Sequence, residues 1–231
     1  MYAARLRASL PRVEERIAGA LARAGRAGPV GIVAVTKGHP PEAAAAALEA
    51  GLRRLGENRV QELEAKVATI GRENAEWHLI GHLQRNKVRK ALPLFDLIES
   101  VDSLRLAREL SAEAQRSGRE VRALVQVNTS GEATKGGFPG DEALDGVASV
   151  AALPHIRVLG LMTMAPLTDD EAVVRRTFAR ARELFERCAR EVPGFHAQHL
   201  SMGMSGDFEI AVEEGSTLVR LGTILFGERN P

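Results

Sequence analysis

Short apolar runs alternate with longer segments of helical period along the whole chain, and this alternation constrains the fold more than any other feature. We predict eight strands, at residues 30–36, 53–56, 77–80, 95–99, 121–127, 156–162, 197–201 and 218–221. We predict seven helices between and after them, at residues 41–50, 59–70, 85–92, 103–117, 141–151, 171–190 and 207–214, and another over residues 3–24. Strands that alternate with helices pair in parallel through right-handed crossovers.

Eight such strands favour an α/β fold, a closed (β/α)8 TIM-type barrel in one domain spanning residues 1–231. An open, doubly wound sheet is the alternative architecture. The last predicted strand ends at residue 221 of 231, and we expect the residues after it to be too few for a full eighth helix. We expect the N-terminal helix to cover that gap or the barrel floor.

The overall charge gives no sign of a polyanionic partner. The chain carries 31 basic and 30 acidic residues, for a net charge of +1, so we expect neither a nucleic-acid nor a membrane partner. The basic run at residues 85–90 is interpreted as a solvated helix face, with a local anion or nucleic-acid patch as the alternative. The single cysteine, Cys188, cannot form an internal disulfide and is interpreted as a packed residue, which fits a reducing cytoplasm. We also expect a monomer.

Polar residues occur in or just after several predicted strands. Lys37 and Asn58 follow strands one and two, His78 lies in strand three, Ser201 ends strand seven and Arg220 lies in strand eight. The carboxyl ends of barrel strands form the face on which enzymes with this fold build their sites. We therefore expect these side chains to gather around one pocket.

Lys37 is the residue with the clearest chemistry. It follows the apolar run I-V-A-V-T, and partial burial there favours its neutral amine. A neutral amine attacks an aldehyde to form a Schiff base. The alternative is an ion pair between Lys37 and Glu57.

Two segments of small residues predict a phosphate site. They are L-S-M-G-M-S-G-D-F-E-I-A, which leads strand seven into a helix, and G-S-T-L-V-R-L-G-T-I-L-F-G-E-R, which does something similar after strand eight. Small residues let backbone N–H groups approach an anion, and phosphate sites in barrels often form after these two strands. The candidate ligands are Ser201, Ser205, Gly222 and Thr223.

The chain lacks the motifs of two common classes of enzyme. It contains no H-E-x-x-H and no G-x-S-x-G. His78 and His82 are four residues apart, but the strand context keeps them off a common helix face. We expect no metal site.

Seven segments, in order, resemble the pyridoxal phosphate homeostasis protein family, whose members are relatives of the barrel domain of alanine racemase. They are V-A-V-T-K, L-G-E-N-R-V-Q-E, W-H-L-I-G-H-L-Q-R-N-K, Q-V-N-T-S-G-E-A-T-K-G-G, G-L-M-T-M, L-S-M-G-M-S-G-D and G-S-T-L-V-R-L-G-T-I-L-F-G. The resemblance runs from about residue 30 to residue 229.

The resemblance implies a fold-type-III barrel that binds pyridoxal 5'-phosphate (PLP). Lys37 would carry the cofactor as an internal aldimine, and Arg220 would face the pyridine nitrogen. The full set of implied cofactor residues is Lys37, Asn58, His78, Ser201, Met202, Ser205, Arg220, Gly222 and Thr223. The implied function is to carry PLP or to regulate vitamin B6 and amino-acid pools without established catalysis, with PLP-dependent apoenzymes as candidate partners.

The alternative function is amino-acid racemisation, which needs a second proton-transfer group opposite the lysine. In alanine racemase that group is a tyrosine on an additional β-domain. This chain has one tyrosine, Tyr2, and we expect no room for such a domain. A cationic Arg220 at the ring nitrogen would also weaken the ring as an electron sink. A third possibility, an RNA-binding or structural barrel, is supported only by the basic run at residues 85–90.

Overall fold

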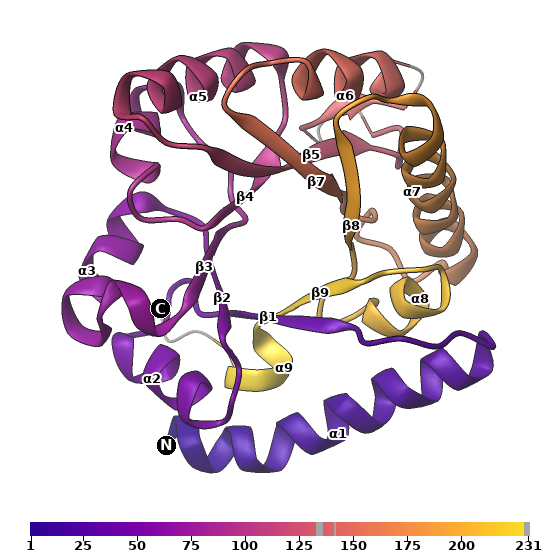
Figure 1. Ribbon diagram of the computed structural model, residues 1–231. Helices are drawn as coiled ribbons and strands as arrows, with labels where there is room; N and C mark the ends of the chain where they lie inside the picture. Colours follow the sequence, from indigo (N-terminus) through magenta and orange to yellow (C-terminus); the bar gives the residue numbers. More distant parts are fainter. Residues whose placement is uncertain (133–135, 141, 229–231) are drawn as a thin grey trace.

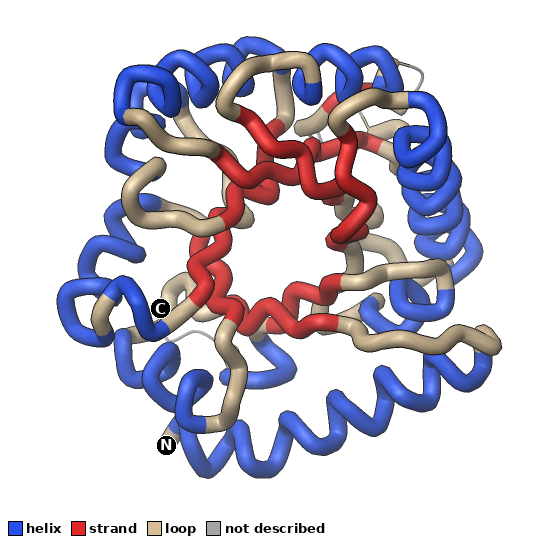
Figure 2. Tube along the Cα trace, in the orientation of Figure 1, coloured by secondary structure: helices blue, strands red, loops and turns tan. Residues whose placement is uncertain are grey.

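A closed ring of parallel strands forms the centre of the computed structural model, which describes residues 1–132, 136–140 and 142–228 (Figures 1 and 2). Its eight described strands are β1 Gly31–Val35, β2 Arg54–Glu57, β3 Glu76–Leu79, β4 Leu97–Val101, β5 Val121–Asn128, β7 Ile156–Met162, β8 Phe195–Ser201 and β9 Leu218–Leu221. The ring runs β1-β2-β3-β4-β5-β7-β8-β9, and β9 pairs with β1 to close it. A two-residue strand, β6 (Phe138–Pro139), pairs with the end of β5. The predicted TIM-type barrel is therefore confirmed.

Helices surround the ring on the outside, as Figure 2 shows. They are α1 Tyr2–Arg23, α2 Pro41–Glu49, α3 Val60–Ile70, α4 Val88–Ala91, α5 Leu104–Ser117, α6 Ala143–Ala151, α7 Glu171–Glu191, α8 Phe208–Glu213 and α9 Thr223–Phe226, with 3-10 turns at Arg72–Asn74 and Arg85–Lys87. Their apolar faces pack on the strands in one large core that includes Trp77, Leu110 and Phe178. Burial of these faces is the main force that holds the helices against the barrel.

Several predicted elements differ from the observed ones; β8, for example, begins at Phe195 rather than at residue 197. The fourth strand spans Leu97–Val101 rather than residues 95–99. Just before it, the carboxylate of Asp96 accepts a hydrogen bond from the amide of Trp77, on β3, at 2.7 Å. The helix predicted at residues 85–92 is divided into a 3-10 turn and the short helix α4. The predicted helix start at Asp141 and part of the loop at 128–140 lie outside the described residues.

Helix α1 occupies the space that a full eighth helix would fill. It runs along the outside of β1 and β9 (Figure 1) and packs against α2, α8 and α9. Its buried face consists of Leu6, Leu10, Val13, Ile17 and Ala20, at helical spacing. The gap-covering role predicted for the N-terminal helix is confirmed.

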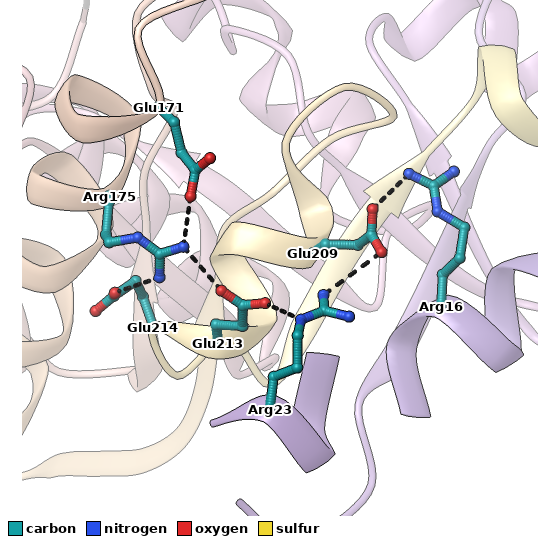
Figure 3. Close-up of polar contacts among 7 residues, drawn as sticks. All are labelled: Arg16, Arg23, Glu171, Arg175, Glu209, Glu213 and Glu214. Carbon is teal, nitrogen blue, oxygen red and sulfur yellow. Dashed lines mark hydrogen bonds and ion pairs between the residues drawn. The ribbon is translucent and has the colours of Figure 1, made fainter. Parts of the chain in front are cut away.

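Ion pairs fasten α8 to its two neighbours, α1 and α7 (Figure 3). We call this group the α8 network; its members are Arg16, Arg23, Glu171, Arg175, Glu209, Glu213 and Glu214. Arg16 lies 2.7 Å from Glu209, and Arg23 lies 2.7 Å from Glu213. Arg175 lies 2.8 Å from Glu213. Because α8 follows the segment L-S-M-G-M-S-G-D, the network helps to fix where that segment ends.

The described part of the chain offers neither a membrane span nor a metal centre. None of its helices combines the length and the apolar character needed to cross a bilayer. Among the same residues, no three His, Cys, Asp or Glu side chains gather as metal ligands. Cys188 is buried in α7, and burial raises the pKa of its thiol to about 12, so it stays protonated and unreactive at neutral pH.

Candidate functional site

A cavity of about 570 Å³ opens at the carboxyl ends of the strands. Loops that follow β1, β2, β3, β4, β7, β8 and β9 contribute to its wall. The lining residues are Val35, Lys37, His39, Asn58, Ile80, Gly81, His82, Asp102, Gln126, Gly136, Met164, Met204, Ser205, Gly206, Arg220, Gly222 and Thr223. This is the face of the barrel on which we expected the polar residues to gather.

Lys37 is half-buried at the end of β1, and a buried ion pair supports the backbone beside it. Lys66 forms an ion pair with Glu57 and also donates to the carbonyl of Thr36 at 2.6 Å. The hydroxyl of Thr36 donates to the same Glu57 oxygen at 2.5 Å. Burial raises the pKa of Glu57, against the opposing effect of Lys66. Glu57 is thus the partner of Lys66 and Thr36.

Arg220 brings a buried cation to the cavity. Only 4% of it is exposed, and it donates to the hydroxyl of Ser201 at 2.7 Å and to the carbonyl of Thr163 at 3.0 Å. A guanidinium has five N–H donors, so these two bonds leave further donors for a ligand. Burial lowers the pKa of Arg220, an effect that Glu99 and Asp207 oppose.

A line of polar side chains runs through the barrel interior beneath Arg220. The hydroxyl of Ser201 donates to one carboxylate oxygen of Glu99 at 2.5 Å, and the other oxygen lies 2.6 Å from Nδ1 of His78. Nε2 of His78 lies 3.6 Å from Glu76. We call Glu76, His78, Glu99, Ser201 and Arg220 the buried chain.

Opposite charges alternate along the buried chain. Burial raises the pKa of Glu99, but the hydrogen bond from His78 and the charge of Arg220 outweigh it and lower that pKa overall. Burial lowers the pKa of His78, but Glu76 and Glu99 outweigh it and raise that pKa overall. His78 in turn lowers the pKa of Glu76 to about 2. Two carboxylates therefore balance two cations inside the barrel.

The loops after β8 and β9 meet at the opposite side of the cavity from the loops after β3 and β4. The hydroxyl of Ser205 accepts a hydrogen bond from the amide of Ile224 at 3.3 Å, which joins the two loops. Gly222 packs closely on β1: an added Cβ would lie 3.3 Å from the carbonyl oxygen of Val35. A small residue at Gly222 therefore keeps this corner of the cavity open beside Thr223.

Most of the residues proposed from the sequence lie together in the cavity wall. They are Lys37, Asn58, Ser205, Arg220, Gly222 and Thr223. His78, Ser201 and Met202 are fully buried and do not belong to that wall. Ser201 and His78 belong to the buried chain instead, so the hydroxyl of Ser201 already has Glu99 and Arg220 as partners.

The sequence-based predictions missed several members of the wall, above all His39, His82, Asp102 and Gln126. Nδ1 of His82 lies 2.7 Å from the carboxylate of Asp102. Ser103 alone supplies the side-chain cap of α5. The position of Asp102 directly after β4 was a signal that could have placed it at the cavity.

Comparison with known proteins gives a consistent result. Residues 9–230 match the family model described as the alanine racemase N-terminal domain. A curated relative from Aquifex aeolicus, named pyridoxal phosphate homeostasis protein, is 42% identical over 95% of this chain and 96% of its own. The PipY structure of Synechococcus elongatus with PLP bound is 39% identical, with a TM-score of 0.80 over 91% of this chain and all of that one.

More distant structures show the fold alone. An alanine racemase of Clostridium difficile is 16% identical, with a TM-score of 0.74 over 96% of this chain and 60% of its own. The level of identity to the Aquifex protein, the coverage of both chains and the family-model match together assign the family. The chain therefore belongs to the pyridoxal phosphate homeostasis protein family, on a barrel of the alanine racemase N-terminal type.

Proposed function

We propose that this chain binds PLP in the cavity and acts as a carrier or regulator of the cofactor, and through it of amino-acid pools. One observation carries the proposal: Lys37, Arg220 and the corner formed by Ser205, Gly222 and Thr223 border the same cavity. The name shared by the relatives and the PLP bound in PipY support it. PLP-dependent apoenzymes are the recipients that we propose.

The residues present fit the three functional groups of PLP. The amine of Lys37 suits the aldehyde, with which it would form a Schiff base and release water. The donors of Arg220 that remain after its two hydrogen bonds suit a neutral pyridine nitrogen, which is an acceptor. Ser205 and Thr223 offer hydroxyls to a phosphate.

The same residues argue for a weak catalyst. Bound PLP supplies an electron sink, which is strongest when its ring nitrogen is protonated. Arg220 favours the unprotonated ring, because a guanidinium only donates. Glu99 is separated from that position by Ser201. Tyr2 does not belong to the described cavity wall, and its hydroxyl lies 3.2 Å from Nδ1 of His39.

Borohydride reduction tests the binding proposal. The PLP-loaded protein should show a visible absorption band that reduction removes, with the adduct on the peptide that contains Lys37. Lys37→Ala should lose the band, whereas Lys90→Ala, a change at an exposed lysine, should keep it. An undiminished band in Lys37→Ala would show that the lysine assignment is wrong.

Titration with pyridoxal, which lacks the phosphate, tests the anion corner. Each charge-assisted hydrogen bond contributes about 1.5–3 kcal/mol, so pyridoxal should bind far more weakly than PLP. Ser205→Ala should weaken PLP binding and leave pyridoxal binding unchanged. Equal affinities of the wild type for both ligands would place the phosphate elsewhere.

An assay of alanine racemisation tests the carrier role. The loaded protein should turn over far less than about once per second, the lower end of common enzyme rates. Turnover at or above that rate would favour the racemase alternative.

A further inference from the structure

His82 and Asp102 form a hydrogen-bonded pair in the cavity wall that the proposed function does not use. Nδ1 of His82 lies 2.7 Å from Oδ2 of Asp102. The carboxylate accepts, so Nδ1 carries the proton and Nε2 holds the lone pair of the neutral ring. Among the described residues, Nε2 of His82 has no hydrogen-bond partner. The pair therefore presents a proton acceptor at the cavity.

The backbone around the pair is held firmly. An added Cβ at Gly81 would lie 2.6 Å from the carbonyl oxygen of Asn58, so only glycine permits this close approach of the two loops. The hydroxyl of Ser100 donates to the carbonyl of Gly81 at 2.6 Å. The side chain of Asp102 is 14% exposed, whereas that of His82 is 69% exposed. A half-buried carboxylate thus orients a ring that solvent can reach.

The pair stands across the barrel from the proposed phosphate corner. In the ring of strands, β3 lies opposite β8 and β4 lies opposite β9. His82 and Asp102 follow β3 and β4, whereas Ser205 and Thr223 follow β8 and β9. A cofactor anchored at Ser205 and Lys37 would leave the side of the cavity next to His82 for a second, small molecule.

We infer that His82, oriented by Asp102, accepts the proton of an incoming small primary amine, such as an amino acid, that displaces Lys37 from the cofactor. This inference rests on the proposed function. The ammonium form of the amine gives one proton to Nε2 of His82. If the C=N bond to Lys37 is protonated, the nitrogen of the amine would then bond to the former aldehyde carbon and pass a second proton to Nζ. The bond from that carbon to Nζ would break, Lys37 would leave as a neutral amine, and the incoming nitrogen would take over the protonated C=N bond. Protons and electrons balance without an oxidant or reductant.

Exchange kinetics with two amines test the inference. Glycine must lose a proton before it attacks, whereas methoxyamine is already neutral at neutral pH. Stopped-flow absorbance of the loaded protein should show that His82→Gln slows the reaction with glycine about tenfold or more and leaves methoxyamine unaffected. Asp102→Asn should slow glycine in the same way. His196→Gln, a change at an exposed histidine at the start of β8, should affect neither amine.

Nitrogen-15 NMR of the cofactor-free protein gives a readout that does not depend on exchange. The neutral ring of His82 should carry its proton on Nδ1 in the wild type, and Asp102→Asn should shift the proton toward Nε2. Equal slowing of both amines, or no slowing, in His82→Gln would overturn the inference alone. Absence of any borohydride-sensitive band in the wild type would overturn the proposed function, and this inference with it.

Discussion

The buried chain and the α8 network use the same chemistry in opposite surroundings. Both join carboxylates to cations at short range, 2.6 Å for His78–Glu99 and 2.7 Å for Arg23–Glu213. The members of the first pair are at most 1% exposed, whereas the side chain of Arg23 is 55% exposed. Solvent screens the exposed pair, but the buried ions depend on each other because they have given up their hydration.

This difference separates two roles for charge. Inside the barrel, His78 and Arg220 lower the pKa of Glu99, and the charge of Glu99 offsets theirs beneath the cavity. On the surface, the ion pairs of the α8 network join α8 to α1 and α7 (Figure 3), and their arginines are 38–55% exposed. Removing one charge from the buried chain should therefore lower the free energy of unfolding far more than removing one charge from the α8 network.

Glu99→Gln should produce the largest effect. The substitution keeps the shape of the side chain but removes the charge that balances His78 and Arg220, and breaking a buried ionic group in this way costs about 3–5 kcal/mol. Urea unfolding should show a loss of that size. A loss below about 1 kcal/mol, the value of an exposed pair, would break the contrast between the two regions.

Lys66→Met should be nearly as damaging, because it leaves Glu57 buried without its cation; the expected loss is about 3 kcal/mol. Combining it with Glu57→Gln should recover much of that loss, since the double variant buries no charge. Lys90→Met, at an exposed site, is the matched control for urea unfolding. Failure of the double variant to recover stability would indicate that the pair contributes more than charge balance.

The pH dependence should show the contribution of His78. Its pKa is raised in the folded protein above its ordinary value of 6.5. The stabilisation is therefore complete below that value and is lost as the pH rises through the folded pKa. Unfolding free energies measured from pH 6 upward should decline, and His78→Gln should flatten that decline. The same slope in both proteins would mean that another group titrates there.

Arg175→Gln should have the smallest effect. The substitution removes three surface ion pairs, but exposed pairs contribute about 0–1 kcal/mol, and added salt should reduce even that. Urea unfolding at low and high salt provides the measurement. A loss of several kcal/mol that persists in high salt would show that the α8 network behaves like an interior cluster.

The sequence predicted the barrel well because the pattern of apolar residues directly reports which segments are buried. The strands at Val121–Asn128 and Ile156–Met162 were placed to within one residue. The start of β4 was misplaced by two residues. The Asp96 side chain before it bonds to the Trp77 amide, 19 positions earlier, and a contact between distant residues leaves no periodic signal in the sequence.

The sequence predicted the cavity less completely than the barrel. Lys37 and Arg220 could be placed because one directly follows a recognisable strand and the other lies within one. How deep a residue lies below the rim of the barrel, however, depends on the register between strands. Ser201 ends its strand as predicted, and yet it contacts Glu99 rather than the cavity. The pairing of His82 with Asp102 joins residues 20 positions apart, which no local pattern could reveal.

The pairing of β1 with β9 also determines when, during synthesis, the cavity becomes complete enough to bind PLP. Lys37 is translated well before Arg220 and Thr223. The register that aligns Val33 with Arg220 forms only when these distant segments meet, a contact of long sequence separation that is slow to form. A nascent or truncated chain that ends before β9 would expose the lysine without the rest of the cavity. Because the full cavity needs β9 beside β1, binding of PLP would show that the barrel has closed.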